Sequence, residues 1–302
     1  MEIDPFIFRL SIFVLSIFIG YYVVWSVTPS LHTPLMSVTN AISSVIIVGA
    51  IIAGLSGDIE NIFHWASITK LVTALATLVA IEEGTLDLDA PAGPPGSTIR
   101  HLLAHASGLP FEGDLPVGIP GRRRIYSNSG FALLGSELAH AAEISFQEYV
   151  KAAVFDPLSI TSSSLRPSGD HAIPAAGGHG PIGDLVLLAK ELMHPTLIAK
   201  ETYSEAIVAA FSEIDGVVPG FGRQSPCEWG LGFEIRGQKI PHWTGRENSP
   251  RTFGHFGGSG TFLWVDPDVP CSLICLTNRV FGSWAKKAWP EFSDAVLSEI
   301  PK

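Results

Sequence analysis

The chain has 302 residues, of which 46% are hydrophobic and 16% are charged, and its formal net charge is −10. This length can bury the core of one large domain or of two smaller ones. The negative charge argues against a nucleic-acid partner, because binding to phosphates requires a basic surface.

The apolar excess lies at the N-terminus, where Arg9 is the only charged residue between Pro5 and Ser56. Residues 6–27 are long enough to span a bilayer, and two tyrosines and a tryptophan near their end suit the membrane interface. A second apolar stretch covers residues 36–55. A cleaved signal peptide is the alternative, but the apolar core is too long, no basic region precedes it and a second stretch follows. We therefore predict two transmembrane helices, with a lipid bilayer as partner.

Residues 29–46 (PSLHTPLMSVTNAISSVI) resemble the membrane part of the alpha subunit of the proton-translocating NAD(P) transhydrogenase. The resemblance covers about residues 1–63. It implies a piece of a proton-conducting membrane domain, and in that family this piece holds neither nucleotide site. We expect residues 1–60 to form a membrane segment, and the sequence leaves open which side of the bilayer carries the remainder.

From His64 onward the pattern changes to short helices, turns and strands. A helix is predicted from Ser67 to Glu83, ended by Gly84. Helices that come first and strands that come last indicate a mixed α/β domain on a largely antiparallel sheet. The other predicted helices cover residues 98–105 (capped by Thr98 and including His101 and His105), 128–142, 145–155, 184–193 and 283–300, and the predicted strands cover 229–235, 261–265 and 271–277.

Ser67 and Lys70 form an SxxK pattern at a predicted helix start. Residues three apart share a helix face, so the Lys70 amine can reach the Ser67 hydroxyl. A serine hydroxyl becomes a good nucleophile when a base takes its proton, and a lysine can serve once burial has lowered its pKa. The helix N-terminus also favours developing negative charge. A second SxxK, from Ser283 to Lys286, is interpreted as a chance match because no further elements follow it.

Two further elements follow Ser67 in order, a YxN pattern (Tyr126-Ser127-Asn128) and an HxG pattern (His255-Phe256-Gly257). Penicillin-recognising enzymes combine SxxK with SDN and KTG elements. The YxN and HxG versions resemble the class C β-lactamase branch and its esterase and peptidase relatives. Residues 99–110 (IRHLLAHASGLP) also match the LLxHxSGLP signature of that family, and the resemblance covers about residues 64–300.

The resemblance implies a role for each matching residue. Ser67 would attack the substrate carbonyl and become acylated, while Lys70 and Tyr126 would share the tasks of general base and acid. Backbone N–H groups of Ser67 and Gly258 would form the oxyanion hole, in which one donor is typically worth about 3–4 kcal/mol. The substrate-binding residues implied are Asn128, which would donate to the acyl side, His255, Gly257 and Gly258.

The resemblance also implies a β-lactamase/transpeptidase-like domain of class α/β over residues 61–302, with a mainly antiparallel sheet plus a helical region. Family members place strands of the sheet before the SxxK serine, where this chain has transmembrane-like sequence. The domain is therefore expected to lack its first strands, and the chain to be a fusion of two unlike pieces.

We predict a serine hydrolase that cleaves ester or amide bonds through an acyl-enzyme on Ser67. An esterase is favoured, and β-lactams and D-amino-acid peptides remain open as substrates. One alternative is a membrane transport component, a transhydrogenase fragment fused to an inactive passenger domain. Another is a catalytically dead penicillin-recognising module.

Other patterns point to different sites. His101 and His105 lie four apart and could bind zinc, but no glutamate follows His101 as HExxH requires, so a structural role is favoured. Residues 178–183 satisfy GxGxxG but lack the preceding strand of a dinucleotide site. Residues 122–124, three arginines, are interpreted as a solvated loop. No metal or organic cofactor is predicted, and Cys271 and the later Cys275 would lie about 13 Å apart in a strand, too far for a disulfide.

Overall fold

The computed structural model describes residues 61–167, 169 and 172–300. The two apolar stretches predicted to span a membrane lie outside these residues. Within the part described, no helix combines the length and the apolar character that crossing a bilayer requires.

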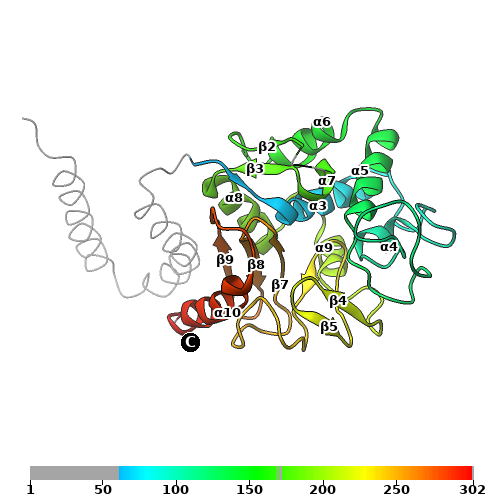
Figure 1. The fold of residues 1–302 in the computed structure, drawn as a ribbon. Helices are drawn as coiled ribbons and strands as arrows, with labels where there is room; N and C mark the ends of the chain where they lie inside the picture. The colour runs from blue at the N-terminus through cyan, green and yellow to red at the C-terminus, as the bar shows by residue number, and fades with distance from the viewer. Residues whose placement is uncertain (1–60, 168, 170–171, 301–302) are drawn as a thin grey trace, which may run out of the picture. The chain divides into compact units, whose positions relative to one another are not determined.

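A four-stranded antiparallel sheet forms the C-terminal part of the fold (Figure 1). Each strand pairs with the next in the sequence, and the strands are β6 (Glu234–Ile235), β7 (Phe253–Gly257), β8 (Thr261–Asp266) and β9 (Cys271–Cys275). The two last strands confirm the prediction. The predicted strand over 229–235 is wrong except for its end, because Gly232 turns the chain with a φ of 92°. Strand β7 escaped prediction because its two glycines depress strand propensity.

Neighbouring residues of β8 face two different hydrophobic clusters, as the period of two in a strand requires. Leu263 joins the larger cluster, which includes residues of helix α8 (Ile182–Met193). Phe262 and Trp264 join the smaller one, to which helix α10 (Ser283–Ser298) contributes. The sheet therefore lies between α8 on one face and α10 on the other (Figure 1). In the described residues this sheet contains no strand from before Glu234, and the predicted loss of the first strands remains a prediction.

Helix α3 (Thr69–Glu82) is the central element of the core and follows a single 3-10 turn, η1 (Ala66–Ile68). Every residue from Thr69 to Ala80 is buried, as is typical of a helix that is apolar on all faces. Gly84 follows the helix with a φ of 74°, a left-handed conformation that glycine adopts at little cost. The predicted helix from Ser67 to Glu83 is thus confirmed.

Shorter elements surround α3 and carry the loops that meet above its N-terminus. The remaining helices are α4 (Ile99–Leu103), α5 (Asn128–Ala142), α6 (Phe146–Val150), the π-helical turn η2 (Lys151–Phe155), α7 (Ile173–Ala176) and α9 (Lys200–Ala206). A small sheet has the order β1-β3-β2, from β1 (Phe63–His64), β2 (Ser164–Leu165) and β3 (Gly178–Gly180), and β4 (Gly216–Val218) pairs with β5 (Gly222–Gln224).

Two sequence predictions are wrong in this region. Helix α4 ends at Leu103, so His105 lies beyond it, with a φ of 54°. Arg124 does not lie in a solvated loop, because only 1% of it is exposed. Its guanidinium donates hydrogen bonds to the backbone carbonyls of Ala104, Ala210, Phe211 and Cys227. These neutral acceptors satisfy a buried cation without a carboxylate partner.

Candidate active site

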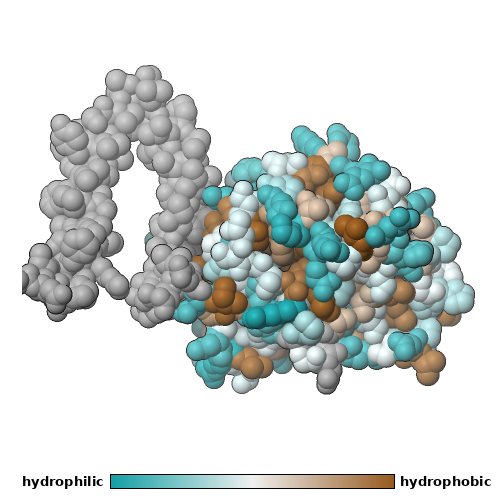
Figure 2. Space-filling model, turned by 90° about the horizontal axis from the view of Figure 1, so that it is seen from above, coloured by the Kyte–Doolittle hydropathy of each residue, from teal (hydrophilic) through white to brown (hydrophobic). Residues whose placement is uncertain are grey.

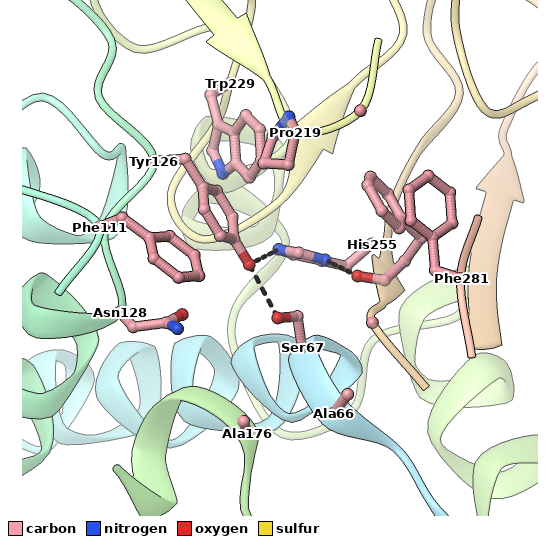
Figure 3. A pocket seen from close by; sticks show the side chains of 13 residues that line it. Ala66, Ser67, Phe111, Tyr126, Asn128, Ala176, Pro219, Trp229, His255 and Phe281 are labelled. Carbon is pink, nitrogen blue, oxygen red and sulfur yellow. Dashed lines mark hydrogen bonds between the residues drawn. The ribbon is translucent and has the colours of Figure 1, made fainter. Parts of the chain in front are cut away.

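The N-terminus of α3 places Ser67 and Lys70 on one face, with 3.1 Å between the Lys70 Nζ and the Ser67 Oγ. Ser67 lies in the turn η1, immediately after Ala66, whose φ is 46°. A left-handed conformation in a non-glycine residue is a local strain that surrounding contacts must hold, and such strain clusters at functional sites. The turn therefore presents the Ser67 hydroxyl to a pocket above the helix (Figure 3).

Lys70 is fully buried and has three hydrogen-bond partners. Besides Ser67, its Nζ lies 2.7 Å from the Oδ1 of Asn128 and 2.9 Å from the carbonyl oxygen of Ala175. Burial holds the pKa of Lys70 well below its usual value, and the negative charge of Glu112 only partly opposes this effect. The amine therefore loses its proton far more easily than an exposed lysine does.

Tyr126 points into the pocket toward the Ser67 hydroxyl (Figure 3). Its hydroxyl donates to the Ser67 Oγ at 2.8 Å and lies 3.4 Å from the Nε2 of His255. Burial raises the pKa of Tyr126, and the negative charges of Glu234 and Glu112 raise it further, although the hydrogen bond to Ser67 lowers it. The phenol consequently keeps its proton at neutral pH.

The tautomer of His255 follows from its neighbours. Its Nδ1 lies 2.7 Å from the carbonyl oxygen of Phe256, which can only accept, so Nδ1 carries the hydrogen. Burial lowers the pKa of His255 to about 3, and the nearby Lys70 charge acts in the same direction. The ring is therefore neutral at pH 7, and its Nε2 lone pair offers a second, more distant acceptor to the Tyr126 hydroxyl, whose one hydrogen points to Ser67.

Asn128 is oriented by Glu112, a residue that the sequence motifs did not single out. The Nδ2 of Asn128 donates to a carboxylate oxygen of Glu112 at 2.8 Å, and this contact turns its Oδ1 toward Lys70. A carboxylate can only accept, so the amide orientation is fixed at both ends. One Nδ2 hydrogen is thus already used, which leaves the second for the substrate contact that the family resemblance implies.

Gly257 and Gly258 lie where β7 approaches the turn before Ser67. A Cβ on Gly257 would lie 2.5 Å from the carbonyl oxygen of Trp65, so only glycine permits this approach. Two hydroxyls hold the same turn in place. Ser259 donates to the carbonyl of His64 at 2.7 Å, and Thr261 donates to the carbonyl of Trp65 at 3.1 Å. Gly257 is therefore a spacer, whereas Gly258 lines the pocket.

The pocket encloses about 340 Å³ and its walls are mostly aromatic and aliphatic. Five of the predicted residues line it, namely Ser67, Tyr126, Asn128, His255 and Gly258, whereas Lys70 lies beneath it. Sequence reasoning missed most of the wall, because large apolar residues in loops carry no local signal. The residues missed are Ala66, Phe111, Ala176, Pro219, Gly220, Trp229 and Phe281.

The two histidines that could have bound zinc have other partners. The Nδ1 of His101 lies 2.9 Å from the Thr98 hydroxyl, and the Nδ1 of His105 accepts from the backbone N–H of Ser127 at 3.1 Å. His105 therefore fixes the chain next to Tyr126. Among residues 61–167, 169 and 172–300, no three His, Cys, Asp or Glu side chains gather closely enough to hold a metal.

Comparison with known proteins places this site in a family. Residues 58–296 match the beta-lactamase family model. The chain belongs to the beta-lactamase family. A crystal structure of a beta-lactamase from Mycobacterium bovis is 46% identical, with a TM-score of 0.77, and the match covers 80% of this chain and 89% of that one. The predicted β-lactamase/transpeptidase-like fold is thereby confirmed. Simvastatin synthase from Aspergillus terreus shares this fold at 18% identity, with a TM-score of 0.64 and coverage of 80% and 82%.

A second match concerns the N-terminus. Residues 9–84 match the model of the 4TM region of pyridine nucleotide transhydrogenase. An alpha-subunit chain of the NAD(P) transhydrogenase of Rickettsia prowazekii is 53% identical over 78 residues, which are 26% of this chain and 54% of that protein. The match thus covers about half or less of the length of these curated relatives, namely 54% of the Rickettsia protein and 36% of a second one from Rhodospirillum rubrum. The predicted transhydrogenase resemblance is confirmed.

Behind the pocket of this beta-lactamase-family domain lies a buried group of charges. The Nζ of Lys239 is 3.1 Å from an oxygen of Glu234 and 5.5 Å from the centre of the Trp229 ring, and both side chains of the ion pair are fully buried. His242 and Trp243 also contact the Glu234 carboxylate, at 3.1 and 2.8 Å. Burial alone would raise the pKa of Glu234, but Lys239 and His242 outweigh it and hold the pKa below its usual value. The group supports Trp229, which lines the pocket.

Replacing Glu234 by glutamine is expected to destabilise the domain by about 3–5 kcal/mol, because the buried ammonium of Lys239 then lacks a counter-charge. Urea unfolding of the full chain in detergent, followed by tryptophan fluorescence, measures the loss. The matched control is Asp268→Asn, which breaks the exposed ion pair with Arg251 and should cost about 1 kcal/mol or less. Equal losses in the two variants would contradict this account of the buried pair.

Proposed function

We propose that the chain is a serine hydrolase that cleaves ester or amide bonds through an acyl-enzyme on Ser67. The observation that carries the proposal is the pair of contacts on the Ser67 oxygen, at 3.1 Å from Lys70 and 2.8 Å from Tyr126, at the base of a pocket. A serine with one proton acceptor and one proton donor in hydrogen-bond reach has the partners that nucleophilic catalysis requires. Membership of the beta-lactamase family supports the same reaction class.

Lys70 acts as the general base, and the count of its hydrogens supports this role. A neutral amine has two hydrogens and one lone pair. The Asn128 Oδ1 and the Ala175 carbonyl can only accept, so they take both hydrogens. The lone pair then faces the Ser67 hydroxyl and receives its proton. The lowered pKa of Lys70 makes this neutral form more accessible than it is in an exposed lysine.

Acylation then proceeds with the proton balance closed. The Ser67 oxygen bonds to the substrate carbonyl carbon as its proton passes to Lys70, and backbone N–H groups of Ser67 and Gly258 bind the developing oxyanion. In the described turns, loops and helix caps, neither N–H donates to a backbone carbonyl. When the tetrahedral intermediate collapses, the bond to the leaving group breaks and Tyr126 gives that group its proton. Passage of the Lys70 proton to the Tyr126 phenolate restores both groups, and attack of water on the acyl carbon then releases the acid and returns a hydrogen to Ser67.

The substrates that fit this site best are uncharged esters of apolar acids. The pocket walls are apolar, and His255, which occupies the place of the usual lysine, is neutral because burial lowers its pKa to about 3. A hydrolase with promiscuous acyltransferase activity shares the fold. An esterase is therefore favoured over a β-lactamase.

Covalent labelling tests the proposal. A serine-directed fluorophosphonate is expected to label the full chain with one adduct, and peptide mass spectrometry should locate the adduct on Ser67. Absence of labelling would instead favour the membrane-transport alternative with an inactive passenger domain, for which the transhydrogenase match over residues 9–84 is the specific support. The same match supports a membrane location, which we propose for the whole chain.

A further inference from the structure

Three segments that contribute to the pocket wall also carry exposed apolar side chains. They are residues 110–124, 216–224 and 279–287, which supply Phe111, Pro219 and Phe281 to the wall (Figure 3); we call them the rim segments. Of the eleven large hydrophobic residues that are exposed in the described part of the chain, six lie on the rim segments. These six are Phe111, Leu115, Val117, Ile119, Val217 and Val280.

Scattered single exposed hydrophobic residues need no explanation, and the face in Figure 2 shows such separate groups among hydrophilic residues. The loop of residues 110–120 is different, because Leu115, Val117 and Ile119 are 82%, 65% and 69% exposed and alternate along one short stretch. Polar residues could occupy these positions without loss to the core. Their apolar character therefore calls for an apolar environment outside the domain.

The charge of the rim segments is opposite to that of the chain. The chain carries a formal net charge of −10, yet the exposed charges of the rim segments are mostly basic. Arg223 is paired with Asp215, which lies just before the second rim segment. The exposed basic residues of the rim segments are Arg122, Arg123, Arg223, Arg279, Lys286 and Lys287, against the acidic residues Glu112 and Asp114.

Apolar side chains beside basic ones are the combination that binds an anionic membrane surface. The apolar groups enter the boundary between headgroups and acyl chains, while arginine and lysine pair with anionic headgroups. A second observation favours a bilayer, since residues 9–84 match a transhydrogenase membrane region. Such a region would keep the domain beside a bilayer.

We propose that the rim segments dock on an anionic lipid surface, so that the pocket receives acyl esters directly from the bilayer. The docking does not depend on the proposed hydrolase function, whereas the delivery of esters does. Phe111 belongs both to the exposed loop and to the pocket wall, and it therefore gives an apolar acyl chain a continuous path from the lipid to Ser67.

A fluorescent label tests the docking without any substrate. The full chain carrying Leu115→Cys is labelled with a nitrobenzoxadiazole thiol reagent and reconstituted into vesicles of phosphatidylcholine with phosphatidylglycerol. The control is Ile144→Cys, at an exposed apolar residue that follows α5 and lies outside the rim segments. The three cysteines of the unsubstituted chain should react little with the thiol reagent, because Cys227 and Cys271 are buried and Cys275 is half-buried. Unsubstituted chain carried through the same labelling gives the background.

The label at position 115 is expected to emit at shorter wavelength and to be quenched by aqueous iodide about 5-fold less than the label at position 144, as for a group that enters the interface. Equal quenching at both positions overturns the docking. If the label at position 115 is protected from iodide equally well in vesicles of phosphatidylcholine alone, the assignment to an anionic surface is overturned.

A kinetic comparison tests the delivery of substrate. Leu115→Ser, Val117→Ser and Ile119→Ser are combined in one variant, whose three positions lie outside the pocket wall. Its kcat/KM for a long-chain ester held in anionic vesicles is expected to fall about 10-fold or more, as bilayer access is lost, while hydrolysis of p-nitrophenyl acetate in water persists. If the triple variant loses kcat/KM equally for the long-chain ester and for p-nitrophenyl acetate, the proposed delivery from the bilayer is overturned. If the parent chain hydrolyses neither ester, the proposed hydrolase function fails and the labelling result still decides the docking.

Discussion

Replacement of Ser67 by alanine is expected to reduce kcat/KM for p-nitrophenyl butyrate by about 10⁴-fold or more, the range found when an enzyme loses its nucleophile. The hydroxyl that Lys70 and Tyr126 both contact is then gone. No other described group lies in the same position to form the acyl-enzyme. Steady-state kinetics on the full chain, with release of p-nitrophenolate as the signal, measures the loss.

The second SxxK pattern of the chain provides a matched control. Ser283 begins helix α10, and neither Ser283 nor Lys286 lines the pocket. Ser283→Ala should therefore leave ester hydrolysis nearly unchanged. Full activity in the Ser67 variant, or equal loss in both variants, would contradict the proposed mechanism.

Preference for uncharged esters over β-lactams is the second large effect that we expect. β-Lactam antibiotics carry a carboxylate, which enzymes with a Lys-Thr-Gly element meet with an ammonium group and a hydroxyl. Here His255 is neutral and Phe256 has no hydroxyl. Losing one charge-assisted and one neutral hydrogen bond costs roughly 2–4 kcal/mol, or about 30- to 800-fold in kcat/KM. The measurement compares p-nitrophenyl butyrate with nitrocefin on one preparation.

Only two of the three consecutive arginines could contact the carboxylate of a β-lactam. Arg124 cannot supply the missing carboxylate contact, because its guanidinium is buried against backbone carbonyls. Arg122 and Arg123 are exposed and could reach a ligand only if the loop moved. A kcat/KM for nitrocefin equal to or above that for the ester would show that one of these two arginines, or another cation, meets the carboxylate. Repeating the comparison with Arg122→Ala and Arg123→Ala would identify it.

The proton-handling part of the site was predictable because its residues belong to short motifs. The spacing of Ser67 and Lys70 follows from helix geometry alone, and their contact at 3.1 Å confirms it. Tyr126 and His255 came from the resemblance to a family, since no local rule brings residues 129 positions apart to 3.4 Å. Sequence motifs thus predicted the polar centre of the site.

The supporting residues escaped prediction for a physical reason. Glu112 orients Asn128 and Lys239 supports Trp229, but each acts through contacts that exist only in the folded chain. The three consecutive arginines show the same limit. Their side chains are identical in sequence, yet only Arg124 points inward, where four carbonyls accept from it. Strand β7 was missed because tertiary pairing, not the propensity of its glycines, decides its conformation.

The hydrogen bond from Ser259 to the carbonyl of His64 joins positions 195 residues apart. During synthesis the Ser67 turn leaves the ribosome before the strand that completes the pocket and before the helix α10 that covers the sheet. A nascent chain therefore carries its serine and lysine long before it can polarise a carbonyl. The proposed ester cleavage would therefore report that strand β7 has paired against the Ser67 turn.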